Sequence, residues 1–134
     1  MTYFLDNTFG KQTAAILQML DVDAVHLQDE FAPNTMDVDW IPEVSRKGYV
    51  LITGDGRIRK GGAERAALEQ SRLRAIFFYN GYTNLNIWEQ VAFIVRLWPA
   101  IDSEAQRMKP GETRHLSVNG NISTFEAIAA KRKK

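Results

Sequence analysis

One continuous apolar run limits most strongly what this chain can fold into. Residues Tyr49-Val50-Leu51-Ile52-Thr53 are apolar or β-branched without polar alternation, and Gly54-Asp55-Gly56 ends the run abruptly. A strand with one face in water alternates apolar and polar residues, whereas a central strand of a parallel sheet is covered on both faces and does not. The run therefore predicts a central parallel strand.

Shorter apolar runs alternate with segments of helical character on either side of this strand. The further strands expected from these runs are residues 3–5, 24–27 and 75–79. Helices are expected after Gly10, between Asp39 and Gly48, over residues 63–73, and from Asn86 to about Pro99. This order predicts an α/β fold of three layers, α/β/α, with a central, mostly parallel sheet and right-handed crossovers.

Residues at the ends of these segments lead to further expectations. Asp39 is expected to cap its helix, since Pro42 would then lie in the first turn, where proline is tolerated. Residues 29–36 contain Pro33 and Asn34 and are expected to form a loop. Pro99 is expected to kink or end the last helix. The tryptophans at positions 40, 88 and 98 are expected in the core.

The C-terminal part differs in character from the rest. Residues 114–118 and 121–124 flank Asn119-Gly120, a pair that suits a two-residue hairpin turn. We expect this small β-hairpin to pair at the edge of the sheet. A length of 134 residues fits one domain, so we expect a single unit over 1–134 that includes the hairpin and a basic tail at about 113–134.

Composition excludes several kinds of site. The chain has no cysteine and only two histidines, which excludes disulfides, thiol catalysis and cysteine-ligated zinc. The longest aliphatic and aromatic run, residues 91–95, is far too short to span a bilayer, and the N-terminus shows no targeting segment. We therefore expect a cytoplasmic protein without a membrane partner.

Aspartates stand where the predicted strands end and where a helix begins. Asp6 and Asp55 follow apolar runs, and Asp37 and Asp39 precede the helix that leads to the central strand. Carboxyl ends of parallel strands meet at one edge of a sheet, where grouped carboxylates repel each other unless a hard divalent cation is bound. The pattern predicts Mg²⁺ or Mn²⁺ and favours phosphodiester hydrolysis by a metal-activated water. The other interpretation, in which each aspartate only serves a turn or a cap, stays open here.

Basic residues gather just beyond the last of these aspartates. Arg57, Arg59 and Lys60 could bind phosphates on either side of a scissile bond, or could simply solvate a loop. A second basic run, residues 131–134, ends the chain. The near-neutral net charge of +1 means that only these local fields would favour a polyanion such as RNA.

The residues from His26 to Phe31, from Asp37 to Ile41 and from Lys47 to Asp55 resemble the PIN-domain nucleases, specifically the small PIN-like toxins of the VapC type. The resemblance covers roughly residues 3–100. It implies a Mg²⁺- or Mn²⁺-dependent endoribonuclease that a cognate antitoxin neutralises. By position, Asp6 and Asp55 would be metal ligands, Asp37 or Asp39 would supply a third carboxylate, and Thr53 would support the site through its hydroxyl.

The sequence departs from the family pattern at one point. Many members carry a further acidic residue beyond the third, but Gly-Arg-Ile-Arg-Lys follows Asp55 and Asn80 follows the strand at 75–79. A second metal ion is therefore not implied. The chain could form a homodimer, which the sequence does not decide.

Two other classes of protein fit parts of the pattern. A catalytically inactive PIN-like binding module would explain the missing acid. A phosphoacceptor receiver domain would use Asp6, Asp55 and a Lys-Pro pair, here Lys109-Pro110, at the end of a strand. Receivers carry two adjacent acids at the first position, whereas Asn7 follows Asp6, which counts against that class.

Overall fold

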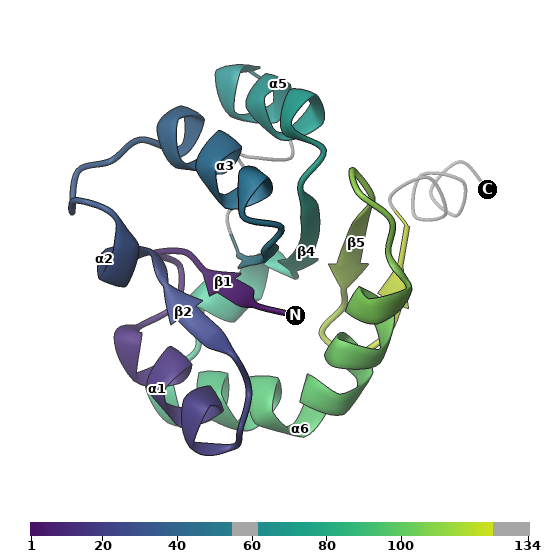
Figure 1. The fold of residues 1–134 in the computed structure, drawn as a ribbon. Helices are drawn as coiled ribbons and strands as arrows, with labels where there is room; N and C mark the ends of the chain where they lie inside the picture. Colours follow the sequence, from purple (N-terminus) through teal and green to yellow (C-terminus); the bar gives the residue numbers. More distant parts are fainter. Residues whose placement is uncertain (55–61, 125–134) are drawn as a thin grey trace.

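A six-stranded sheet in the order β2-β1-β3-β4-β5-β6 organises the chain, of which the computed structural model describes residues 1–54 and 62–124 (Figure 1). The first five strands are parallel to their neighbours, and β6 is antiparallel to β5. Their bounds are β1 (Tyr3–Leu5), β2 (Ala24–His26), β3 (Val50–Thr53), β4 (Arg74–Phe78), β5 (Thr113–Leu116) and β6 (Ile122–Ser123).

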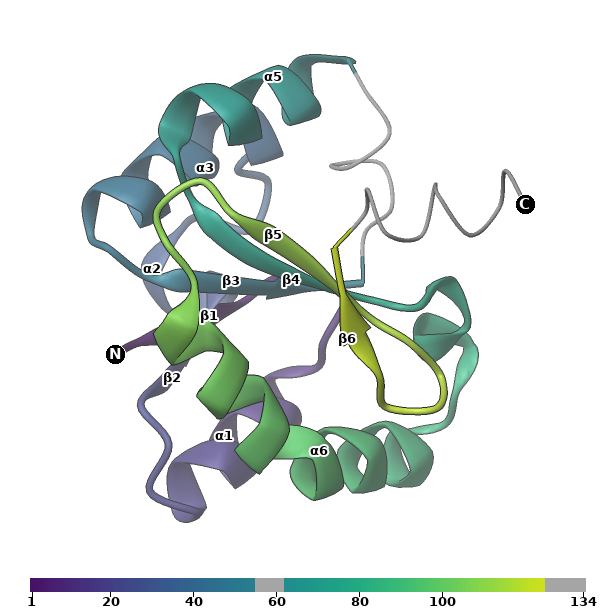
Figure 2. The ribbon, with the colours of Figure 1, turned by 90° about the vertical axis from the view of Figure 1, so that its right-hand side faces the viewer.

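Helices cover both faces of the sheet, so the predicted three-layer α/β/α arrangement is confirmed (Figures 1 and 2). One face packs against α1 (Lys11–Met19) and α6 (Ile87–Arg107). The other packs against α2 (Leu27–Glu30), α3 (Asp37–Arg46) and α5 (Gly62–Ser71). A short 3₁₀ helix, η1 (Asn80–Asn84), follows β4. Within the described ranges, no helix is long and apolar enough to cross a membrane.

Strand residues alternate between the two cores, as the pleat requires. On β1 and β3, Leu5 and Ile52 face the core with α1 and α6, whereas Phe4 and Leu51 face the core with α3 and α5. All four side chains are completely buried. Because both faces are covered, β3 has no polar alternation, which is the basis on which the sequence predicted a central strand.

The order of the strands creates a switch point beside β1. The chain passes from β1 outward to β2, and then crosses back over β1 to β3 and continues to β4. Ligands of open parallel sheets bind outside the carboxyl ends of the strands where the winding direction reverses. Leu5 pairs with Ile52, so the next residues of the two strands, Asp6 and Thr53, end side by side at this point.

The region before β3 differs from its prediction. Residues 27–30 form α2, so the expected loop begins after Glu30, and α3 begins at Asp37 with Met36 as its N-cap. Asp39 therefore lies inside the first turn and does not cap the helix. Pro42 stands within α3, where it removes the N–H that would reach Val38. Val38 and Pro42 both line an open groove of about 430 Å³ between α3 and α5.

The structure also corrects the prediction for α6. The helix continues past Pro99 to Arg107, and its buried residues form one stripe: Phe93, Ile94, Trp98, Ile101 and Ala105. Trp88 lies off this stripe and is 83% exposed, so its placement in the core was wrong. Trp40 and Trp98 are buried as predicted. Because α6 is buried along one side only, apolar residues on its other side remain exposed.

The C-terminal hairpin is confirmed, but its turn is longer than predicted. The Ser117 N–H donates to Asn121 O at 2.9 Å, which leaves three residues in the loop, and the Gly120 N–H donates to Ser117 O at 2.9 Å. Gly120 has φ +86°, the conformation that three-residue hairpin loops place at this position. Lys109-Pro110 precedes β5 and does not end a strand, so the receiver interpretation loses its lysine.

Candidate functional site

The carboxylate of Asp6 lies at the switch point, immediately after β1, and is 4% exposed. Three donors hold it. The backbone N–H of Thr8 donates to Oδ1 at 3.0 Å, the Thr8 hydroxyl donates to the same oxygen, and the hydroxyl of the fully buried Thr53 donates to Oδ2. Hydrogen bonds to both oxygens fix the orientation of the carboxylate, as is common for carboxylates that hold metal ions.

Thr8 also ties the turn after β1 to the end of β3. The Gly54 N–H donates to Thr8 Oγ1 at 2.9 Å, while the same hydroxyl donates to Asp6. The sequence analysis did not identify Thr8. Its position in Asp6-Asn7-Thr8, two residues after an aspartate on a turn, was the available signal, because Asp, Ser and Thr side chains commonly bond nearby backbone groups in turns.

His26 holds the same turn from the opposite side. The imidazole is completely buried; its Nε2 lies 2.8 Å from Phe9 O, and its Nδ1 accepts from the Gln28 N–H at 3.1 Å. A carbonyl can only accept and a backbone N–H can only donate, so His26 is the neutral tautomer with its proton on Nε2. Both ring nitrogens are engaged in the structure, which leaves His26 as a support of the turn and not as a metal ligand.

Asp37 lies at the same edge of the sheet as Asp6. Helix α3 leads into β3, so its first turn stands at the carboxyl edge of the parallel strands. Asp37 Oδ1 accepts from Trp40 Nε1 at 3.0 Å, and the buried Trp40 ring packs on Phe4 with centroids 5.2 Å apart. Phe4 precedes Asp6 by two residues, so the two side chains leave β1 on the same face.

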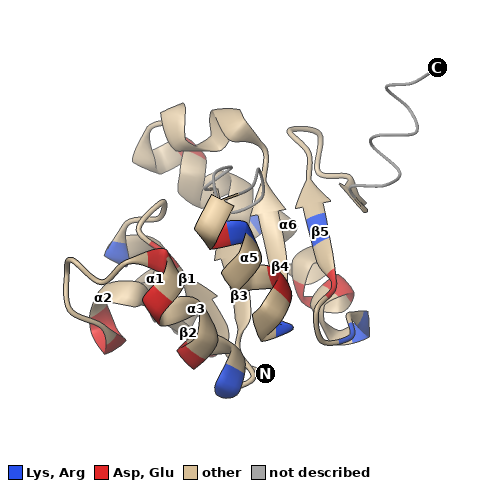
Figure 3. Cartoon of the chain, turned by 90° about the horizontal axis from the view of Figure 1, so that it is seen from above, with Lys and Arg blue, Asp and Glu red and all other residues tan. Residues whose placement is uncertain are grey.

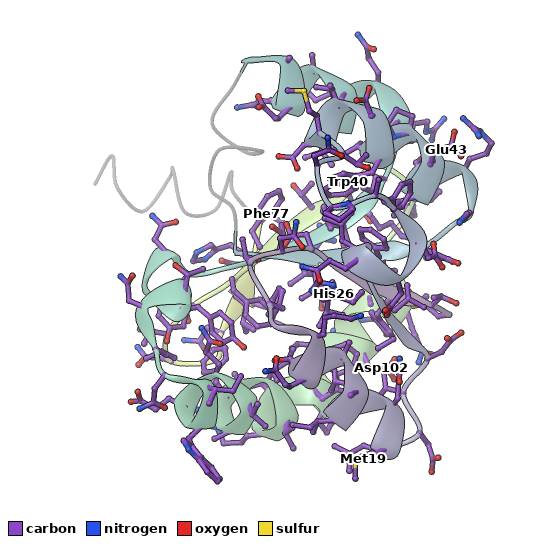
Figure 4. The ribbon with its side chains drawn as sticks, turned by 90° about the vertical axis from the view of Figure 1, so that its left-hand side faces the viewer. Met19, His26, Trp40, Glu43, Phe77 and Asp102 are labelled. Atoms are coloured by element: carbon purple, nitrogen blue, oxygen red, sulfur yellow. The ribbon has the colours of Figure 1, made fainter. Side chains whose placement is uncertain are left out.

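Asp39 is exposed, although it belongs to the same turn of α3. Figure 3 shows acidic positions along α2 and α3, and Figure 4 shows Trp40 under α3 with Glu43 farther along the helix; Trp40 and Phe77 belong to the same buried cluster. Of the two acids that the sequence left open as a ligand, Asp37 is the one hydrogen-bonded to the buried Trp40, whose ring packs on Phe4 of β1.

Four predicted site residues lie outside the described residues: Asp55, Arg57, Arg59 and Lys60. Thr53 and Gly54 are described and lead directly into Asp55 along the chain. Across residues 1–54 and 62–124, no three His, Asp or Glu side chains stand close enough together to hold a metal ion. The predicted set of Asp6, Asp37 and Asp55 thus needs its third member from the segment that follows Gly54.

The donors at this edge fit a hard cation. They are carboxylate and hydroxyl oxygens, the ligands that Mg²⁺ and Mn²⁺ prefer, whereas zinc and copper favour histidine and cysteine. The two histidines do not change this, because His26 is bonded through both nitrogens and His115 lies on β5. The residues present therefore suit Mg²⁺ or Mn²⁺ better than a softer metal.

A polar rim borders the site beside α2. Gln28 Nε2 donates to Asn7 Oδ1 at 3.1 Å, and Lys11 Nζ lies 3.2 Å from Asp29 Oδ1. Partial burial opposes the charged form of Asp29, but the His26 N–H and the Lys11 ammonium outweigh it and hold the pKa of Asp29 below its ordinary value. Asp29 is therefore ionised and paired near neutral pH.

Comparison with known proteins gives one family match. The family described as PIN like domain matches residues 1–80, which is more than half of the chain and spans β1 to β4. The matched region contains Asp6, Thr8, Asp37 and Thr53. Neither the curated proteins nor the solved structures gave a match. The chain belongs to the PIN-like domain family.

Proposed function

We propose that this chain is a Mg²⁺- or Mn²⁺-dependent endoribonuclease. PIN domains are generally nucleases that use divalent metals, which the family match supports. One observation carries the proposal: the buried Asp6 carboxylate lies at the switch point of the sheet, bonded to Thr53, two residues before Asp55. Asp6, Asp55 and Asp37 would hold the cation. The VapC-type resemblance supports RNA as the substrate.

The residues of this chain have separate tasks in the proposed reaction. Thr53 orients Asp6, and the Trp40 indole orients Asp37. Arg57, Arg59 and Lys60 would bind phosphates on either side of the scissile bond. A divalent cation in such a site supplies charge for the phosphoryl oxygen and lowers the pKa of water.

The first test is RNA cleavage by the purified full-length chain with Mn²⁺ or Mg²⁺. We expect Asp6→Asn, Asp55→Asn and Asp37→Asn each to lower kcat by about a hundredfold without unfolding the protein, because each removes one anionic ligand. Asn at position 37 can still accept from Trp40. Glu43→Gln, on the exposed side of α3, is the matched control and should cleave as the wild type does. Equal turnover by Asp6→Asn and wild type would refute the proposal.

The choice between Asp37 and Asp39 is tested separately. Asp37→Asn and Asp39→Asn remove the same charge from the same turn, but Asp37 is the one hydrogen-bonded to the buried Trp40. We expect cleavage to fall for Asp37→Asn and to stay within about threefold of wild type for Asp39→Asn, since an exposed charge contributes little through solvent. The reverse order would assign the third carboxylate to Asp39.

The resemblance to PIN-like toxins supports a cytoplasmic role with a cognate antitoxin as partner. Expression of the wild-type chain alone should then arrest bacterial growth, whereas Asp6→Asn should not. Coexpression of the protein encoded by the neighbouring gene should restore growth and copurify with the chain. Normal growth under wild-type expression, with RNA cleavage confirmed in vitro, would refute the toxin role while leaving the nuclease.

An inactive PIN-like binding module is the second candidate. The groove between α3 and α5 favours it, because the residues that line it are mainly apolar and it is open to solvent: Val38, Pro42, Ala63, Ala66, Ala67, Gln70 and Ser71. Thermal stabilisation by Mn²⁺ without cleavage of any RNA would support this candidate over the nuclease.

A further inference from the structure

We infer that Thr8 is a positioning residue for the cation site, an inference that rests on the proposed function. Its hydroxyl stands between the two strand ends that carry the proposed ligands. It donates to Asp6 Oδ1 after β1 and accepts from the Gly54 N–H after β3 at 2.9 Å. One hydroxyl therefore joins the proposed ligand Asp6 to Gly54, which is the last described residue before the proposed ligand Asp55 in the sequence.

A single hydroxyl oxygen can make both contacts at this place. It donates one hydrogen bond and accepts others, whereas a carboxylate can only accept and an aliphatic side chain can do neither. The backbone N–H of Thr8 is a second donor to Asp6 Oδ1, at 3.0 Å, so Thr8 donates two hydrogen bonds to this oxygen. Loss of the hydroxyl would leave the Gly54 N–H without its acceptor and would remove one of the donors to Asp6.

Thr8 is not explained as a helix cap. The N-cap of α1 is Gly10, which makes no side-chain capping bond, and the side-chain bonds of Thr8 go to Asp6 and Gly54. Thr8 also lies close to Gly54, where an added Cβ would be 3.5 Å from Thr8 Oγ1 and 3.6 Å from Thr8 Cβ. The contacts of Thr8 therefore point to the two strand ends and not to the helix.

The experiment measures Mn²⁺ binding by calorimetry and RNA cleavage on the full-length chain. Thr8→Val keeps the shape and removes the hydroxyl, and Thr8→Ser keeps the hydroxyl. Mutation of a residue that hydrogen-bonds to a metal ligand typically lowers metal affinity or activity by about 10- to 100-fold. We expect Thr8→Val to weaken Mn²⁺ affinity by about tenfold or more and to shift the Mn²⁺ dependence of kcat, with little change in KM for RNA. Thr8→Ser should stay within about threefold of wild type.

The matched control is Thr13→Val on α1. Thr13 is 1% exposed, and its Oγ1 finds no hydrogen-bond partner among the residues that the structure describes. The same chemical change there should leave Mn²⁺ affinity and kcat at the wild-type level. If a general loss of packing were responsible, Thr13→Val and Thr8→Val would weaken Mn²⁺ binding together.

The outcomes separate the two proposals. Wild-type Mn²⁺ affinity and metal dependence in Thr8→Val, with wild-type protein that binds Mn²⁺ and cleaves RNA, would overturn the role of Thr8 alone. Wild-type protein that neither binds Mn²⁺ nor cleaves RNA would overturn the proposed function and this role with it. If Thr8→Val does not fold, Thr8→Cys takes its place, because a thiol is a weak donor and a weak acceptor, with the same expected and overturning results.

Discussion

Gly54, beside the candidate site, is closely packed against η1. A Cβ added there would lie 3.1 Å from Thr83 Cγ2 and 3.5 Å from Thr8 Oγ1. The first distance is shorter than an ordinary van der Waals contact, so η1 leaves no room for a side chain at the end of β3. Glycine is needed at this position for space, since its backbone does not adopt the left-handed conformation.

Gly54→Ala should destabilise the fold by about 1 kcal/mol. Overpacking costs about 1–3 kcal/mol, which exceeds the 0.4–1 kcal/mol that alanine gains by restricting the unfolded chain. Urea unfolding measures the difference. The control is the same change in a Thr83→Ser background, where Cγ2 is absent. There we expect Gly54→Ala to be neutral or stabilising. An equal loss in both backgrounds would show that Thr83 is not the obstacle.

Single residues were predictable from the sequence where type and position along one element were sufficient. Asp6 was found because a carboxylate directly follows an apolar run, and Thr53 through the resemblance to PIN-domain nucleases. Thr8 was missed because its partner Gly54 is 46 residues away, and only the pairing of β1 with β3 brings them together. His26 was named only as one of two histidines, since the carbonyl of Phe9 that it bonds cannot be read from sequence.

At the scale of elements, α6 carries two tryptophans in opposite environments. Trp98 is 8% exposed and meets Tyr3 edge to face, with ring centroids 4.7 Å apart, whereas Trp88 is 83% exposed. Trp98→Ala should lower the free energy of unfolding by about 3–5 kcal/mol, the usual cost of deleting a large buried aromatic side chain. Trp88→Ala should change it by less than about 0.5 kcal/mol. Urea unfolding followed by circular dichroism compares them.

Trp88→Ala is the matched control for Trp98→Ala, since both remove an indole from the same helix. Similar losses at the two positions would contradict the one-sided burial of α6. Fluorescence gives a second check, because a solvent-exposed indole is accessible to iodide and a buried one is not. Iodide quenching of tryptophan fluorescence should therefore be much weaker in Trp88→Ala than in the wild type, and Trp98→Ala should retain it.

Element types were predictable more reliably than element ends. The start of α6 at Asn86 was predicted, and in the structure Asn86 and Glu89 form both hydrogen bonds of a capping box. The start of α3 was misplaced because Met36, which makes no side-chain cap bond, precedes it. The extent of α6 was misjudged because proline weakens a helix without always ending it when tertiary packing favours continuation. A side-chain cap can be recognised from the residue types at the start of a helix. Tertiary packing that overrides helix propensity cannot be recognised from the sequence in this way.

At the scale of the whole molecule, the order of elements along the chain was enough to predict the layers but not the order of the strands. Alternating strands and helices imply a parallel sheet, and right-handed crossovers limit its topology. The switch point between β1 and β3 depends on which side of β1 each strand takes, and the order of elements along the chain does not determine that choice. The residues of the candidate site could therefore be predicted from the sequence, but their arrangement in space could not.

A partly buried ion pair joins the long helix to the sheet and makes stability depend on pH. Glu104 on α6 meets Arg114 on β5 at 2.9 Å, with side chains 19% and 15% exposed, and also meets Arg107 at 2.6 Å. Burial opposes the charged form of Glu104, but the two guanidinium groups outweigh it and hold the pKa below its ordinary value of 4.5. The folded state therefore binds its proton less readily than the unfolded state does.

Stability from this pair should be complete above about pH 5 and should fall as the pH drops through the lower, folded-state pKa, because the unfolded chain binds the proton first. Glu104→Gln should lower the free energy of unfolding at pH 7 by about 1.5–3 kcal/mol, the usual contribution of a hydrogen bond to a charged group. Near pH 3 the difference between variant and wild type should shrink, since the Glu104 carboxyl is then protonated in the unfolded chain. Glu43→Gln removes an exposed pair with Arg46 at 2.8 Å and should cost less than about 0.5 kcal/mol at pH 7.

Urea unfolding of the three proteins from pH 7 to pH 3 gives the comparison. A loss of stability in Glu104→Gln that stays constant across this range would show that packing, not charge, joins α6 to β5.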